Sequence, residues 1–223
     1  MKLEVPSLKL SVLLLQLAEG MLVSTEIFIL TLIFSLPLGL FVAFGRMSKN
    51  AIIRNFVKFY ISIMRGTPLM LQLMVVYFGP YYIFGISLPR YYRFLAVIIG
   101  FVINYAAYFA EIYRGGIESM ETGQYEAAKI LGYSKSQTFL KIILPQVIKR
   151  ILPSITNEVI TLIKDTSLAF VISVSEMFTA AKAIAASQTS TTPFVVAGIF
   201  YYIFNYIVAS IMEWIEKKVG YYK

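Results

Sequence analysis

The segment that decides the fold is residues 126–145, EAAKILGYSKSQTFLKIILP, the longest polar interval in an otherwise apolar chain. Gly132 predicts the end of a short helix that Thr122 caps, because glycine adopts the left-handed conformation of a C-terminal cap at little cost. Ser134 and Gln137 have the spacing of a capping box and predict the start of a second helix. The segment is therefore expected to form a helical hairpin.

The composition around this hairpin is that of a membrane protein. Of the 223 residues, 58% are hydrophobic and the mean hydropathy is +0.74, whereas soluble domains are about 45–50% apolar. We expect an all-α polytopic membrane protein, with residues 1–223 forming a single transmembrane domain. The chain has no cysteine and no histidine, which excludes disulfides, thiol nucleophiles, histidine acid–base chemistry and Cys/His metal sites.

The apolar runs predict five transmembrane helices joined by short loops. A segment at 7–19 has the leucine spacing of an amphipathic helix in the membrane interface, and a cleaved signal peptide is the alternative for it. A loop rich in Gly, Pro and Tyr is expected at 79–93, and a loop of small residues and threonine at 179–192. The spans are predicted at about 20–45, 54–78, 94–113, 147–178 and 193–215, and the polar connecting segment at 118–145.

The net charge of +8 is explained by the lysine and arginine that membrane proteins carry on their cytoplasmic side. With five spans, one side receives the basic cluster at 46–58, the basic residues of 114–150 and the C-terminal lysines. The hairpin and the C-terminus are therefore predicted to be cytoplasmic, and the N-terminus to lie outside. No nucleic-acid-binding patch is expected.

Two of the predicted spans carry similar polar interruptions near mid-membrane, at 65–69 (RGTPL) and 164–168 (KDTSL). Paired interrupted spans are the best sequence indication of a transporter's binding site. A half-helix restarting near Leu69 would present free N–H groups to a carboxylate, and Asp165 is the natural acceptor for an ammonium or guanidinium. The candidate substrate-binding residues are Arg65, Thr67, Leu69, Gln72, Asn104, Glu158, Asp165 and Ser167.

A purely structural role is the alternative for these breaks. Arg65 and Asp165 would then pair with each other, while Thr67 and Ser167 would only satisfy backbone groups that the breaks leave open. An intramembrane enzyme is a further alternative, and it would need Glu158 and Asp165 as its acid pair. Seven residues apart on one helix, they would be separated by about 10 Å, too far to share a proton.

Residues 126–145 resemble the Glu-Ala-Ala loop of importer-type ABC transporter permeases. The stretches 65–69, 106–108 and 164–168 are similar to the polar amino acid branch of that family, although Asn104-Tyr105 stands where a Ser-Ala type pair is often found. In the family this loop forms the coupling helix that docks into a cleft of the ATPase. The resemblance implies a coupling role for Glu126, Ala127, Ala128, Gly132, Ile142, Leu144 and Pro145.

The resemblance also implies the partners: two cytoplasmic ATP-binding subunits, a second permease copy, here expected to form a homodimer, and an extracytoplasmic amino acid-binding protein. The chain has no Gly-x-x-x-x-Gly-Lys-Ser/Thr stretch, so no cofactor is expected in it and ATP-Mg is assigned to the partner ATPase. We expect a non-enzymatic permease subunit that admits a polar, possibly basic, L-amino acid. An ATPase-independent secondary transporter or channel for amino acids or ions is the alternative.

Overall fold

The computed structural model of the chain describes residues 9–220, and in this range it contains helices and loops but no strand. The predicted all-α class is confirmed. The helices are α1 Leu10–Arg46, α2 Ala51–Gly66, α3 Leu69–Phe84, α4 Tyr92–Glu118, α5 Thr122–Ile130, α6 Lys135–Thr138, α7 Leu144–Asp165, α8 Met177–Gln188 and α9 Thr192–Val219, with a π-helical turn at Phe139–Ile143 and a 3₁₀ helix at Thr166–Ile172.

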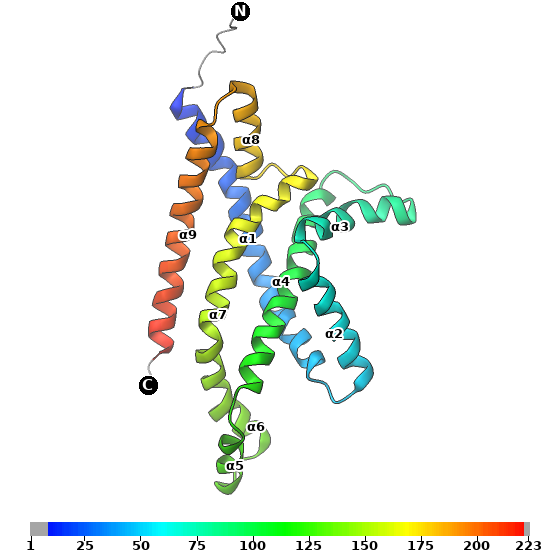
Figure 1. Cartoon of the computed structure of the whole chain (residues 1–223), viewed down its shortest axis with the longest axis vertical. Coiled ribbons are helices and arrows are strands. Elements are labelled where there is room, and N and C mark those ends of the chain that lie inside the picture. Colours follow the sequence, from blue (N-terminus) through cyan, green and yellow to red (C-terminus); the bar gives the residue numbers. More distant parts are fainter. Residues whose placement is uncertain (1–8, 221–223) are drawn as a thin grey trace, which may run out of the picture.

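Among the described residues, three helices, α1, α4 and α9, are each long and apolar enough to cross a membrane. Two bent pairs each qualify as one broken span, which brings the number to as many as five. Helix α3 leaves α2 at 110°, and α8 leaves the segment Lys135–Ile172 at 59°. Figure 1 shows the α5–α6 hairpin at one end of the bundle, with the start of α1 at the opposite end.

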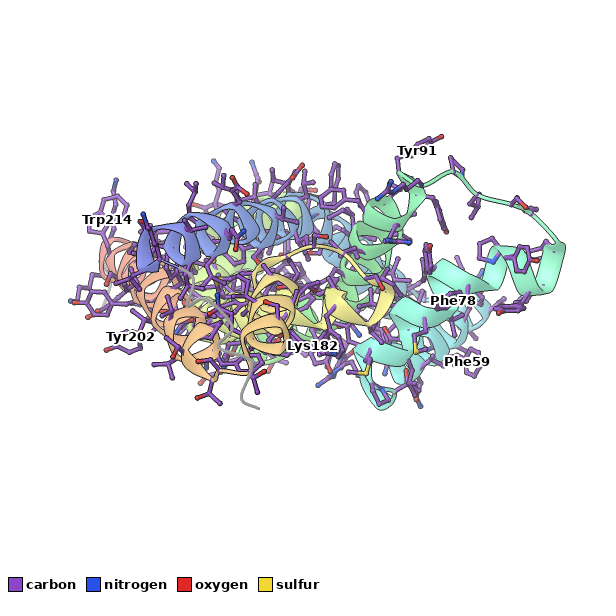
Figure 2. All side chains as sticks on the ribbon, turned by 90° about the horizontal axis from the view of Figure 1, so that it is seen from above. Phe59, Phe78, Tyr91, Lys182, Tyr202 and Trp214 are labelled. Atoms are coloured by element: carbon purple, nitrogen blue, oxygen red, sulfur yellow. The ribbon has the colours of Figure 1, made fainter. Side chains whose placement is uncertain are left out.

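Helices α1 and α4 form the centre of the bundle and run side by side (Figure 1). Gly39 permits their close approach, because a Cβ atom at this position would lie 2.8 Å from Cβ of Phe109. The main core gathers fully buried side chains of these two helices and of α7, among them Ile27, Phe101 and Leu162. Most apolar side chains elsewhere point outward, as Phe59, Tyr202 and Trp214 do in Figure 2.

The separate interfacial helix predicted at 7–19 is not a separate element. Residues from Leu10 onward are the first turns of the continuous helix α1, and residues 7 and 8 lie outside the described range. Leu13 and Leu17 are buried against α8, and a Cβ atom on Gly20 would lie 2.7 Å from Cα of Met177. Residue 20, where the first span was predicted to begin, is thus a packing contact between helices within α1.

The loop predicted at 179–192 is also wrong, because most of it is helix α8. Alanine is the best helix former, and Glu176 caps α8 by accepting hydrogen bonds from the backbone N–H groups of Phe178 and Thr179, at 2.6 and 2.7 Å. The fourth span accordingly breaks later than predicted. Residues 166–172 continue the helix in 3₁₀ form, and the chain turns at Ser173, whose φ is 59°.

Candidate functional site

A cavity of about 360 Å³ lies beside the break between α2 and α3. The break, helix α4, helix α7 and the start of the 3₁₀ helix each contribute to its wall. The lining residues are Thr67, Pro68, Leu69, Asn104, Tyr105, Tyr108, Glu158, Thr161, Asp165 and Leu168. Two interrupted segments that are about a hundred residues apart in the chain therefore face one space.

The break at 66–69 is held open by side chains that replace backbone hydrogen bonds. The Thr67 hydroxyl donates to the carbonyl of Ile63 at 2.9 Å. The side-chain amide of Gln72 donates to the carbonyl of Met64 at 3.0 Å and to the Thr67 hydroxyl at 2.8 Å. Asn104, from α4, donates to the Gln72 side-chain oxygen at 2.9 Å. This network fixes the angle at which α3 leaves α2, and with it the direction of the α3 N-terminus.

The acidic wall of the cavity comes from α7. Glu158, Thr161 and Asp165 follow one another at i, i+3 and i+7, so they share a helix face. The Tyr105 hydroxyl donates to Oδ2 of Asp165 at 2.7 Å. The Tyr105 ring stacks on Phe101, with an interplanar angle of 1° and centroids 6.3 Å apart. The carboxylate of Asp165 is thus oriented by a buried aromatic side chain.

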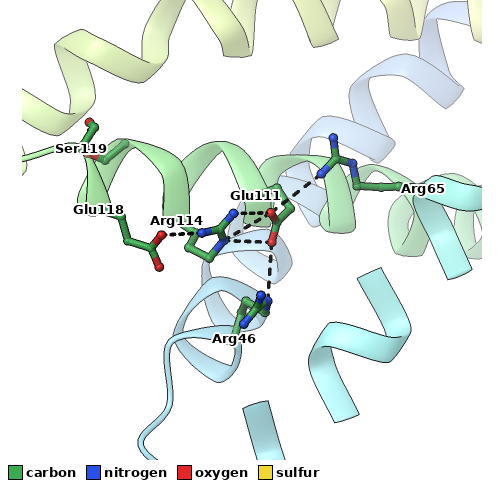
Figure 3. Close-up of polar contacts among 7 residues, drawn as sticks. Arg46, Arg65, Glu111, Arg114, Glu118 and Ser119 are labelled. Carbon is green, nitrogen blue, oxygen red and sulfur yellow. Dashed lines mark hydrogen bonds and ion pairs between the residues drawn. The ribbon is translucent and has the colours of Figure 1, made fainter. Parts of the chain in front are cut away.

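Arg65 does not pair with Asp165, so the ion pair considered as the alternative role for the two breaks does not form. Figure 3 shows Arg65 directed toward Glu111, with 3.9 Å between their charged atoms. Arg46 reaches the same carboxylate at 3.8 Å and Arg114 at 2.6 Å. The Arg65 guanidinium also lies over the ring of Tyr108, 5.2 Å from the centroid. Arg65 lies in the last turn of α2. This helix packs against α4, which carries Glu111.

Five of the candidate substrate-binding residues line the cavity and three do not. Gln72 is buried behind the break, Ser167 donates to the Lys164 carbonyl at 2.7 Å, and Arg65 binds Glu111. The five that line it are Thr67, Leu69, Asn104, Glu158 and Asp165. Their contact with a substrate stays a prediction.

Helix periodicity indicates several lining residues that were not among the predicted site residues. Tyr108 lies four residues after Asn104, and Thr161 lies three residues after Glu158, so each shares a helix face with a candidate. Tyr105 was noted only as a departure from the family pattern. Pro68 and Leu168 also line the cavity, each beside a polar residue of its own break.

The hairpin has the predicted caps, with one difference. Gly132 has φ +78°, and both hydrogen bonds of the Ser134–Gln137 capping box are present, at 2.9 and 3.3 Å. Thr122 is the first residue of α5 rather than its cap, which is Glu121. The cap predicted at Thr122 is therefore wrong, and Glu121 makes no side-chain capping bond in its place.

The hairpin exposes apolar side chains at the end of the molecule. Ile130 is 87% exposed and Leu131 is 74% exposed, and Glu126 and Ala127 are exposed beside them. Ala128, by contrast, is buried within the hairpin. The other predicted coupling residues lie where the hairpin rejoins the bundle: Ile142 and Leu144 are half-buried, and Pro145 lies in the first turn of α7.

Comparison with known proteins assigns the family. Residues 35–221 match the model of the binding-protein-dependent transport system inner membrane component. The chain belongs to this family. A putative glutamine transport system permease protein, GlnP of Rickettsia bellii, is 37% identical over 95% of this chain and 96% of its own. The arginine transport system permease protein ArtQ of Bacillus subtilis is 35% identical over 90% of this chain and 91% of its own.

A solved structure supports the same conclusion. The crystal structure of an amino acid ABC transporter with histidines has a TM-score of 0.83 and 30% identity, covering 91% of this chain and 94% of that one. This permease is therefore the inner-membrane subunit of an amino acid ABC importer, a transport component rather than an enzyme. Membership of the family implies ATP-binding subunits and a substrate-binding protein as partners.

Proposed function

We propose that this permease admits a basic L-amino acid to the cytoplasm through the cavity between α2–α3, α4 and α7. The observation that carries the proposal is the charge of the cavity wall. Among its lining residues, Glu158 and Asp165 are acidic and none is basic. Ionised carboxylates at this depth are costly unless they face a partner or a polar cavity, and a cationic side chain would be that partner.

The other end of the substrate has a matching surface. Thr67, Pro68 and Leu69 bring the N-terminus of α3 to the cavity. The first N–H groups of a helix have no intrahelical partner and carry the positive end of the helix dipole. A carboxylate is favoured at such an end. The cavity thus offers acceptors for a cation on α7 and donors for an anion on α3.

A neutral polar substrate such as glutamine is the second candidate. One of the relatives is named as a putative glutamine permease. The hydrogen bond from Tyr105 to Asp165 also favours it, because the carboxylate already has one donor before a substrate arrives.

We further propose that ATP hydrolysis by the partner drives transport through the α5–α6 hairpin, with ATP-Mg held by that partner and no cofactor in this chain. The exposed Ile130 and Leu131 supply an apolar face for a groove on the ATP-binding subunit. The orientation follows from the positive-inside rule, with the hairpin and C-terminus cytoplasmic and the N-terminus outside. The assembly would hold two copies of this chain and two ATP-binding subunits.

The test is amino acid competition in vesicles that contain the full complex, with arginine, histidine, glutamine and glutamate as competitors. A basic substrate predicts the strongest inhibition by arginine and the weakest by glutamate. Inhibition by glutamine alone would replace the proposed substrate with the second candidate. Uptake that continues without ATP, or a failure of the ATP-binding subunit to co-purify, would reject the proposed coupling.

A further inference from the structure

One arginine ties together three segments on the side of the cavity away from the hairpin. Arg93, in the first turn of α4, donates to the carbonyl of Ser173 at 3.2 Å. Its guanidinium also donates to the Tyr77 hydroxyl of α3, at 3.4 Å from Nε and from Nη2. It therefore joins three segments: the start of α4, the outer part of α3 and the turn that precedes α8.

The turn that Arg93 holds is strained. Ser173 has φ 59°, a left-handed conformation that residues other than glycine rarely adopt. Such a conformation persists only where the surrounding contacts enforce it. The bond from Arg93 to the Ser173 carbonyl is one of those contacts, so its loss would release the turn.

Between Arg93 and the cavity the chain forms a buried, apolar layer. On α4, Val97 and Phe101 lie at four-residue steps between Arg93 and Tyr105, so all four share one stripe of the helix. The distance from Arg93 to Tyr105 along α4 is about 18 Å. Both Val97 and Phe101 are fully buried.

The other two segments repeat this arrangement. On α3, Leu73 lies midway between Leu69 of the cavity and Tyr77, and it is fully buried. In the 3₁₀ helix, Ile172 lies between Leu168 of the cavity and Ser173, and it is 2% exposed. Each segment thus runs from a cavity residue, through a buried apolar residue, to the contacts of Arg93. Leu73, Val97, Phe101 and Ile172 belong to one packed cluster.

We propose that Arg93 is an outer latch, which keeps this apolar layer closed and must release before substrate can enter the cavity from outside. Arg93 is the positioning residue of the gate and makes no contact with the substrate. This inference rests on the proposed transport function and orientation. It places the first step of uptake at the contacts of Arg93 with Tyr77 and Ser173.

The chain has no cysteine, so a single introduced thiol can report access to the cavity. Thr161→Cys places it on the cavity wall. The full complex is held in right-side-out vesicles and treated from outside with a membrane-impermeant maleimide. With Arg93 intact, the thiol should react slowly. With Arg93→Ala, we expect the reaction rate to rise about tenfold, because a charge-assisted hydrogen bond that holds the closed form has been removed.

Arg90→Ala is the matched control, because Arg90 is an exposed arginine three residues away on the same side. Its reaction rate should equal that of the parent. Equal rates for the Arg93 and Arg90 variants would overturn the latch. Arg93→Lys retains the charge and should restore slow labelling in part. If Arg93→Ala does not assemble with the ATP-binding subunit, Tyr77→Phe, which removes only the hydroxyl, is tested by the same criterion.

A second thiol checks the orientation. Ser87→Cys, in the exposed loop between α3 and α4, should react from outside in every variant. Reaction of this thiol only after permeabilisation would reverse the orientation and overturn an outer latch. The labelling readout needs no amino acid, so failure of the latch is distinguishable from failure of the proposed substrate.

Discussion

The Tyr105 hydroxyl donates to Oδ2 of Asp165 at 2.7 Å, across the cavity wall from α4 to α7. Asp165 was predicted from the sequence to bind a substrate cation, whereas no role was predicted for Tyr105. Because the Tyr105 ring is stacked on the buried Phe101, its hydroxyl is fixed, and the orientation of Asp165 depends on it.

Tyr105→Phe should lower the unfolding temperature of the complex. It should also enlarge the increase in unfolding temperature that a basic amino acid produces. Loss of the donor leaves a half-buried carboxylate with an unsatisfied oxygen, at a cost of about 1–3 kcal/mol. A cationic ligand would then recover more free energy in the variant than in the parent. Thermal unfolding with and without arginine measures both effects. If arginine raised the unfolding temperature equally in parent and variant, Tyr105 would have no influence on binding of the cation.

Asp165→Asn should weaken binding of a basic amino acid about tenfold more than binding of glutamine, because only the cation loses a charge-assisted hydrogen bond. Titration calorimetry on the purified complex, without the binding protein, measures the affinity of the cavity alone. Glu158→Gln is the companion variant on the same face of α7. An equal loss for both ligands in the Asp165 variant would assign that residue to structure.

Arg65 and Glu111 should be energetically coupled, whereas Arg65 and Asp165 should not. The structure places Arg65 3.9 Å from Glu111, and partly exposed pairs of this kind contribute up to about 1 kcal/mol. Two double-mutant cycles measure the couplings, one with Arg65→Ala and Glu111→Gln and the other with Arg65→Ala and Asp165→Asn. The unfolding temperature of each variant is the quantity measured. If Asp165→Asn recovered the unfolding temperature lost in Arg65→Ala, Arg65 would be paired with Asp165, contrary to the structure.

Gly132→Ala should impair the coupling of ATP hydrolysis to uptake. Gly132 has φ +78°, a conformation that costs a residue with a Cβ about 1 kcal/mol or more, so the hairpin would be reshaped. Gly123→Ala is the control, because Gly123 lies on α5 with no positive φ and open space around it. Glu126→Ala should uncouple transport without changing substrate affinity. ATPase activity and uptake are measured together in vesicles, and normal coupling in the Gly132 variant would contradict the docking role.

Asn104→Ala should destabilise the break between α2 and α3. The side chain of Asn104 donates to the Gln72 side-chain oxygen and to the Met64 carbonyl, at 2.9 and 3.0 Å. The Met64 carbonyl would keep its bond from Gln72, but loss of Asn104 leaves the buried Gln72 oxygen unpaired, at a cost of about 1–3 kcal/mol. Gln146→Ala is the control, since among the described contacts that exposed amide donates only to the carbonyl of Ile142, in the π-helical turn that adjoins α7. Unfolding temperature distinguishes the two, and equal values would show that the network does not hold the break.

The sequence by itself determined the helical membrane class, the hairpin with its Gly132 and Ser134 caps, and the break after Gly66. Each of these follows from local chemistry: apolar composition, the conformational freedom of glycine, the hydrogen bonds of a capping box, and proline's missing N–H. Local signals failed where distant contacts decide the outcome. Gly20 lies inside α1 because it packs on α8, and the alanine-rich 177–188 is helical because Glu176 caps it.

Only the tertiary structure decided which polar residues meet. The positions of Arg65 and Asp165 in the sequence allowed an ion pair between them. In the structure, α2 crosses α4 so that Arg65 pairs with Glu111. Helix α4 packs on α7 so that Tyr105 donates a hydrogen bond to Asp165. Side-chain pairing between helices depends on the angle at which they cross and on the rotation of each helix about its own axis. Both are set by the whole packed core.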